Sequence, residues 1–177
     1  MNPDPASGAH DGGGEEFYTD MKGRLRWREN DVLAERLKNL HDLLVIGGYD
    51  AGHAARYNRL AYLASRHPEP ISRLHAQSRL SELPGVGKTV AGILSELIET
   101  GTCAKISTPG EGYEPPPPTV LELTAVPRLG AKTARTLYRE HGIDSLAALQ
   151  AALDDGRLDH VPGLGAQALA RLRGIIP

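Results

Sequence analysis

Three short segments of the chain combine proline, glycine and apolar residues in the pattern of a tight turn that opens a helix. They read Leu-Pro-Gly-Val-Gly at 83–87 (turn one), Val-Pro-Arg-Leu-Gly at 126–130 (turn two) and Val-Pro-Gly-Leu-Gly at 161–165 (turn three). Proline cannot continue the helix before it, and glycine allows a positive φ and a close approach of another molecule. The first N–H groups of the following helix are unpaired and lie at the positive end of its dipole. Each turn is therefore a candidate site for an anion such as phosphate.

Basic and hydroxyl side chains accompany the turns and extend the candidate site. Arg128 stands where the other two turns have glycine, and its guanidinium is suited to phosphate. Backbone amides and cations hold the phosphates of DNA without reading its bases, so the pattern favours DNA binding that is independent of sequence. The expected contacts are Gly85, Val86, Gly87, Lys88, Thr89, Arg128, Gly130, Lys132, Thr133, Arg135, Gly163, Gly165 and Arg171.

Composition and charge narrow the class of protein. The 177 residues are 40% apolar and include one cysteine, so a disulfide framework is excluded. No signal segment or long apolar run is present, and we expect a cytoplasmic, nucleoid-associated protein with no membrane partner. Residues 1–20 hold five acidic and no Lys or Arg residues, which leaves 20 basic against 17 acidic residues, a net charge of +3, in the remainder.

The chain divides by composition into four parts. Residues 1–24 are rich in Gly, Pro, Asp and Ser and are expected to form a disordered acidic tail, which either improves solubility or mimics nucleic acid. Residues 25–106 should form a helical domain with turn one, and 119–177 a second one with turns two and three. The Pro-rich segment 107–118 is expected to be a stiff linker between them. No stretch alternates in the manner of a strand, so the expected class is all-α.

Helical spacing and caps predict the individual helices. The first begins near Asn30 or Asp31, both good N-cap residues, and ends at Gly47. Its inward residues are expected to be Val32, Leu33, Leu37, Leu40, Leu43 and Leu44. The other helical segments are expected at 51–67, 71–76, 78–83, 88–100, 120–125, 131–141 and 145–153.

The three turns resemble the helix-hairpin-helix motif, and the chain from about residue 30 to 176 is similar to the amino-terminal region of family X DNA polymerases. The resemblance rests on Arg-Tyr-Asn at 56–58, turn one, Glu-Thr-Gly at 99–101, and the segment 123–130 followed by Ala134. It implies tandem helix-hairpin-helix domains. In that family the first unit grips the 5′-phosphate side of a DNA gap, with deoxyribose-phosphate lyase activity in some members, and the second hairpin holds the primer-side backbone.

The same resemblance implies further binding residues. Arg56 matches the family's 5′-phosphate position and Lys105 another basic one, and Arg59 lies on the same helix as Arg56. Thr89 stands where the family has a phosphate-binding lysine. Family members can hold a monovalent cation, Na⁺ or K⁺, on backbone carbonyls of the hairpins. The matching carbonyls here are those of Ser81, Leu83 and Val86, and of Thr124, Val126 and Leu129.

Two departures from the family pattern lead us to expect a protein without catalytic activity. The polymerase catalytic domain would follow turn three, where this chain ends, so polymerase activity is not expected. The lyase nucleophile of the family is a lysine, and Ile93 occupies its position. A Schiff base needs a primary amine. Lys88 and Lys105 are the nearest amines in the sequence, which leaves a lyase with a substituted nucleophile as the alternative from the enzyme class.

Several alternatives remain open at the level of sequence. The expected function is binding of gapped, nicked or single-stranded DNA in repair, and the non-catalytic alternative is an interaction module for a repair polymerase or nuclease. Trp27 could stack on an exposed base or staple the first helix, whereas Tyr57 is expected in the core. Five arginines between residues 56 and 79 could face DNA or form an ordinary solvated surface. They are Arg56, Arg59, Arg66, Arg73 and Arg79.

Overall fold

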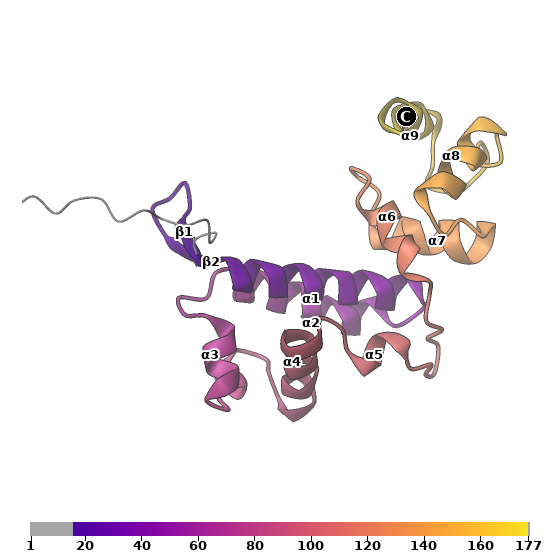
Figure 1. Cartoon of the computed structure of the whole chain (residues 1–177). Coiled ribbons are helices and arrows are strands. Elements are labelled where there is room, and N and C mark those ends of the chain that lie inside the picture. The colour runs from indigo at the N-terminus through magenta and orange to yellow at the C-terminus, as the bar shows by residue number, and fades with distance from the viewer. Residues whose placement is uncertain (1–15, 177) are drawn as a thin grey trace, which may run out of the picture.

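A computed structural model describes residues 16–176, and residues 1–15 and 177 lie outside this description. Its axis is the long helix α1 (Arg28–Ile46), and α2 (Ala51–Ser65) packs along it (Figure 1). On one side of this pair lie α3 (Ile71–Ala76), η1 (Leu80–Glu82), α4 (Lys88–Thr100) and α5 (Ala104–Ser107), which complete the first lobe. On the other side the second lobe comprises η2 (Pro118–Val120), α6 (Leu121–Thr124), α7 (Ala131–His141), α8 (Leu146–Asp154) and α9 (Ala166–Ile175).

The two lobes have separate hydrophobic cores that share α1. Leu37, Leu40 and Leu44 of α1 are buried in the first core, together with Tyr57 of α2, as expected for that residue. Leu43 and Ile46 of the same helix belong to the second core. Because the last four residues of α1, Leu43–Ile46, are all apolar, this end is covered from two directions. The second lobe is therefore anchored on a helix that the first lobe also needs.

The segment 107–118 folds back on the first lobe, so the prediction of a plain extended linker was wrong for its central part. Tyr113 is buried in the first core, and its hydroxyl donates to the carbonyl oxygen of Ile106. The Glu114 N–H donates to the Gly47 carbonyl at 2.9 Å. Burial raises the pKa of the Tyr113 phenol to about 12. One large aromatic side chain thus fastens the connection between the lobes.

A small β-hairpin precedes α1, where a disordered tail was expected. Strands β1 (Phe17–Thr19) and β2 (Leu25–Trp27) pair antiparallel, with Phe17 opposite Trp27. The disorder prediction is therefore wrong for residues 16–24, and its remaining part, 1–15, lies outside the described residues. The class is mostly helical rather than purely α. The Trp27 indole N–H donates to the Pro68 carbonyl at 2.9 Å, which ties the start of α1 to the segment after α2.

Several predicted helix boundaries shift because tertiary contacts decide them. α1 begins at Arg28, and Asn30 is buried inside it, where its Oδ1 accepts the Ile71 N–H at 2.8 Å. Asn30 therefore caps α3 and not its own helix. Val32, expected inward, is 46% exposed. The predicted helix 78–83 is only the single turn η1, and α2 ends two residues before the predicted 67.

Helices bounded by glycine match the sequence prediction. α4 ends before Gly101 and α7 before Gly142, and both glycines have a positive φ, of 80° and 66°. Ser145 caps α8 by accepting the Ala148 N–H. None of the helices within residues 16–176 is long and apolar enough to cross a membrane.

Candidate nucleic-acid interface

The three glycine turns have the same backbone geometry. In each, the carbonyl of the first residue accepts the N–H of the fourth, at 3.1, 3.0 and 3.0 Å for turns one, two and three. The third residue has a positive φ of 78°, 67° and 88°. With proline second and a positive φ third, this is the pattern of a type II turn. The fifth residue is an extended glycine that sits at the N-cap of α4, α7 or α9.

Apolar anchors hold the turns on the surface with their apices open. The first and fourth residues of every turn are buried in a core. The proline and both glycines of turn one are exposed, and the same positions are exposed in turns two and three. A Cβ added at any of the five turn glycines would meet no atom within 4 Å. A strand of DNA can therefore reach the backbone of each turn from outside.

The helices that follow the turns begin without a side-chain acceptor from the described residues. Within the described part of the chain, no side chain caps α4, α7 or α9, and none of these helices has an acidic residue in its first turn. Their first N–H groups are left for an external partner, at the positive end of the helix dipole.

The N-termini of the other helices have hydrogen-bond acceptors or acidic residues within the protein. Side-chain oxygens of Asp50, Asn30 and Glu96 accept from the first turns of α2, α3 and α5. α8 has two acceptors, Ser145 and Glu122, at 3.2 and 2.9 Å. α1 carries Glu29 and Asp31 in its first turn, and α6 continues directly from η2. The open N-termini thus coincide with the three glycine turns, which is the arrangement an anion-binding surface requires.

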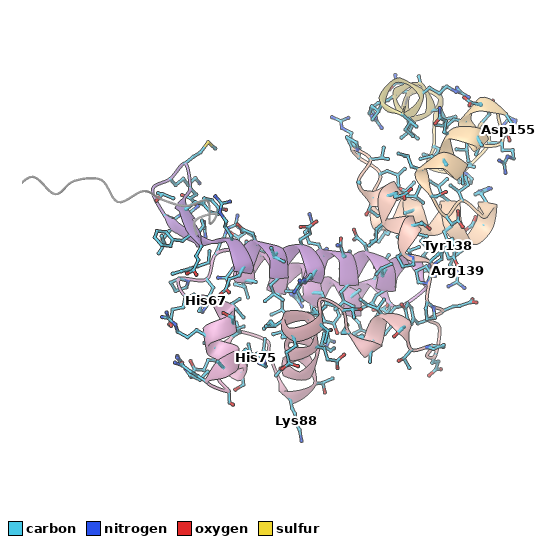
Figure 2. The ribbon with its side chains drawn as sticks, viewed as in Figure 1. His67, His75, Lys88, Tyr138, Arg139 and Asp155 are labelled. Atoms are coloured by element: carbon cyan, nitrogen blue, oxygen red, sulfur yellow. The ribbon has the colours of Figure 1, made fainter. Side chains whose placement is uncertain are left out.

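Cations near the turns form no ion pairs with the carboxylates of the described residues. Lys88 extends away from the free end of α4 (Figure 2). Thr89, Arg128, Lys132 and Arg171 are exposed as well, and Thr133 and Arg135 are half-buried. Among residues 16–176, no carboxylate forms an ion pair with any of these Lys or Arg side chains, whereas Arg79 and Arg157 are paired with Glu82 and Asp155. Free cations beside open amides favour phosphate.

Arg128 has a backbone conformation that arginine rarely adopts. Its φ of 67° falls in the left-handed region, where the equivalent residues of turns one and three are glycine. For a residue with a Cβ this costs roughly 1–2 kcal/mol. Strain of this kind is often retained where the side chain serves a function. The exposed guanidinium of turn two is consistent with such a role.

The basic residues that the family resemblance implied lie on α2 and α5 of the first lobe. Arg56 and Arg59 are exposed on α2, and the Arg56 Nε donates to the His53 carbonyl. The Lys105 Nζ lies 4.4 Å from the ring centroid of Tyr49. Among the described residues, no hydrogen bond or ion pair joins these three side chains to turn one. Turn one lies at the end of α4 that points away from α1 (Figures 1 and 2). Arg73 pairs with Glu69, as a solvated surface residue does.

The carbonyls expected to bind a monovalent cation have lone pairs to spare. Those of Leu83 and Val126 each accept one turn hydrogen bond. Within the described residues, the carbonyls of Ser81, Val86, Thr124 and Leu129 accept none. Backbone oxygens of this kind suit a hard cation. The described residues contain no cluster of His, Cys, Asp and Glu that could hold a metal ion.

The three turns are divided between two sides of the molecule. Figure 1 shows α4, which follows turn one, on the opposite side of α1 from the whole second lobe, which carries turns two and three. The candidate interface therefore has two separate regions, turn one on the first lobe and turns two and three on the second.

Comparison with known proteins agrees with the geometry of the second lobe. Residues 120–173 match the family model of the SAM-like helix-hairpin-helix tandem. No curated protein matches the chain. Domains of this type generally bind nucleic acid, so the match supports DNA as a partner. The second lobe, with turns two and three, is therefore similar to a helix-hairpin-helix tandem over residues 120–173.

Proposed function

We propose that this protein binds DNA through backbone phosphates, without reading sequence, and acts on gapped, nicked or single-stranded DNA during repair. The observation that carries the proposal is that three exposed glycine turns precede α4, α7 and α9, whose first turns receive no side-chain acceptor from residues 16–176. Phosphate oxygens would accept from the first N–H groups of α4, α7 and α9. Lys88, Lys132 and Arg171 would add charge and release counterions.

A monovalent cation fits the same turns. Na⁺ or K⁺ held by the carbonyls of Leu83 and Val126, with their neighbours, would bring positive charge to a phosphate that approaches the turn. The amides would contact the phosphate directly, so the ion would strengthen binding without being required for it.

The placement of the turns favours DNA that is interrupted. Turn one and the second-lobe turns face different sides of α1 (Figure 1). Intact duplex resists bending, at a cost of roughly 1–6 kcal/mol for a bend of 40–90° over a short site. A nick or gap removes most of this resistance, because one strand is no longer continuous. Broken DNA can therefore reach both lobes more easily than intact duplex.

The proposal is for a binding protein and not a lyase. Ile93, at the position of the family's nucleophile, is buried in the first core. The Lys105 amine is engaged over the Tyr49 ring, which leaves Lys88 as the free amine at turn one among the described residues. Borohydride should therefore trap no covalent adduct with abasic DNA. An adduct that disappears in Lys88→Ala would establish the lyase instead.

A binding titration tests the function directly. Duplex, nicked, 5′-phosphorylated gapped and single-stranded DNA of equal length are compared at two salt concentrations. We expect the interrupted DNA to bind more tightly than the intact duplex, and every affinity to fall steeply with salt. Undetectable or salt-insensitive binding would contradict the proposal and favour an interaction module for a repair polymerase or nuclease.

A further inference from the structure

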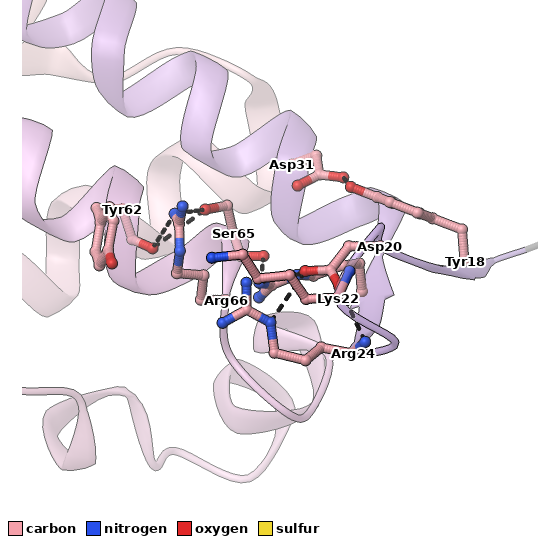
Figure 3. Close-up of polar contacts among 9 residues, drawn as sticks. Tyr18, Asp20, Lys22, Arg24, Asp31, Tyr62, Ser65 and Arg66 are labelled. Carbon is pink, nitrogen blue, oxygen red and sulfur yellow. Dashed lines mark hydrogen bonds and ion pairs between the residues drawn. The ribbon is translucent and has the colours of Figure 1, made fainter.

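An exposed aromatic ring on α2 is stacked with a guanidinium, outside the surface formed by the glycine turns. Tyr62 is 59% exposed, and the Arg66 Cζ lies 3.7 Å from its ring centroid. The Arg66 Nη1 also contacts the Tyr62 carbonyl, at 3.4 Å, and the Ser65 Oγ, at 3.2 Å. The Ser65 hydroxyl donates to the same carbonyl (Figure 3). These contacts hold two planar groups in a preformed stack.

A shallow groove between α1 and α2 leads to this stack. Ala34 and Ala61 contribute small apolar surface to its lining, and Asn58 and Lys38 add polar groups beside Tyr62. Asp31 and Glu35 line the α1 side, where Asp31 accepts the Tyr18 hydroxyl at 2.8 Å. Apart from Tyr62, the groove has no large apolar side chain. This composition suits a flat polar ring better than the apolar face of a protein helix.

The β-hairpin brings positive charge to the Arg66 end of the groove. The Arg26 Nη1 donates to the Ser65 carbonyl at 3.4 Å, so the hairpin is joined to the residue that contacts Arg66. Asp20 is shared between Arg24 and Arg26, which leaves an excess of one positive charge in that cluster. Lys22, next along the hairpin, and Arg66 have no ion pair with another described residue.

We propose that the Tyr62–Arg66 stack is a binding platform for an unpaired nucleobase of single-stranded DNA. The base lies on the stack, and the flanking phosphates contact Lys22 and Arg66. The acidic wall of Asp31 and Glu35 repels phosphate and offers acceptors to the N–H groups of a base, which fixes the base in the groove and the backbone on the hairpin side. This inference rests on the proposed function. It assigns the unpaired bases of nicked, gapped or single-stranded DNA to the first lobe.

Alanine and phenylalanine variants separate stacking from other roles of the tyrosine. Removing a base-stacking aromatic weakens binding by roughly 5- to 150-fold per base. Tyr62→Ala should lose that much affinity for a single-stranded oligonucleotide and keep its affinity for intact duplex. Tyr62→Phe should bind like the wild type, because the ring is retained. Val32→Ala, which trims another exposed apolar side chain of the first lobe outside the groove, is the matched control.

A fluorescent base makes the contact visible. An oligonucleotide containing 2-aminopurine should be quenched on binding to the wild type and to Tyr62→Phe, and not by Tyr62→Ala, with circular dichroism showing that each variant is folded. The inference fails if a folded Tyr62→Ala binds single strands like the wild type, if it loses duplex and single strands equally, or if its effect is a change in oligomeric mass. If the wild type binds no form of DNA, the proposed function fails as well. This outcome differs from failure of the inference alone, in which the wild type still binds DNA.

Discussion

The Arg139 guanidinium of α7 donates through Nη1 to the carbonyl oxygen of Gly47 at 2.8 Å, across 92 residues of sequence. The same oxygen accepts the N–H of Glu114 at 2.9 Å. Gly47 is therefore the point where the end of α1, the connecting segment and the second lobe meet. The position of the second lobe relative to the first depends on this junction, because Ile46, the residue before Gly47, is buried in the core of the second lobe.

Gly47→Ala should destabilise the protein through this junction. An added Cβ would clash with the Tyr113 ring and lie 2.6 Å from the Glu114 carbonyl oxygen. Overpacking of this kind costs about 1–3 kcal/mol of unfolding free energy. Gly92→Ala is the control, because its Cβ would meet nothing within 4 Å on an exposed face of α4, and there alanine should stabilise the helix by about 0.5–1 kcal/mol. Urea denaturation measures both, and equal stability of Gly47→Ala and the wild type would contradict the clash.

Arg128→Gly should make the protein more stable and its DNA binding weaker. Glycine relieves the left-handed backbone, which is worth roughly 1–2 kcal/mol. Loss of one phosphate-binding cation should lower the slope of log affinity against log salt by about 1. The reverse change at the same position of turn three, Gly163→Ala, should only destabilise, since its φ is 88° and its Cβ would have free space. If Arg128→Gly loses stability, the arginine is not strained in the way its φ indicates.

Sequence could predict the parts of the fold that local rules decide. The bounds of α4 and α7 follow from the glycine before and the glycine after each helix, and the buried face of α2 follows from its helical spacing. The β-hairpin was not predicted, because two strands of three residues are too short to show an alternation of polar and apolar residues. Its order comes from Asp20, which accepts from the Lys22 and Arg24 N–H groups and from Arg26.

In the candidate site, too, the features set by local sequence were predictable and those set by tertiary contacts were not. The turns were predictable because proline and glycine impose them locally. The distinction between open and occupied helix N-termini was not, because Asn30 and Glu96 reach α3 and α5 from other helices. In the sequence, Asn30 and Glu96 are only polar residues within helical segments, and nothing there indicates which helix N-terminus they contact. Tyr62 was not singled out from the sequence, and its partner Arg66 was predicted only as part of a basic surface.

An acidic residue placed in the first turn of a hairpin helix should separate stability from binding. Thr89→Glu in α4 and Gln167→Glu in α9 add negative charge at the positive end of an open helix, which stabilises the helix by about 0.3–1 kcal/mol. The same carboxylate repels phosphate, so affinity for DNA should fall. Ala147→Glu makes an equal change of charge in α8, whose N–H groups Ser145 and Glu122 already occupy. Equal losses of affinity in all three variants would show that net charge, and not the open N-terminus, controls binding.

The attachment of the β-hairpin should depend on pH through Asp20. N–H donation from the Arg24 backbone and hydrogen bonds from Arg26 hold the pKa of this carboxyl well below its ordinary value of 3.8. A depressed carboxyl pKa contributes stability that is fully present above the unfolded-state pKa and is lost as the pH falls toward the folded-state pKa. The hairpin should therefore stay docked from neutral pH down to about 4 and loosen only below it.

Trp27, the one tryptophan of the chain, reports this attachment from within the hairpin. Its emission should be constant from pH 7 to about 4 and shift to the red below that range, as the indole loses its contact with the Pro68 carbonyl. Asp20→Asn removes the charge that Arg24 and Arg26 share, so its emission should already be shifted at pH 7. Asp144→Asn is the control, because it removes an exposed carboxylate of the second lobe. Identical Trp27 spectra for Asp20→Asn and the wild type at pH 7 would mean that strand pairing alone holds the hairpin.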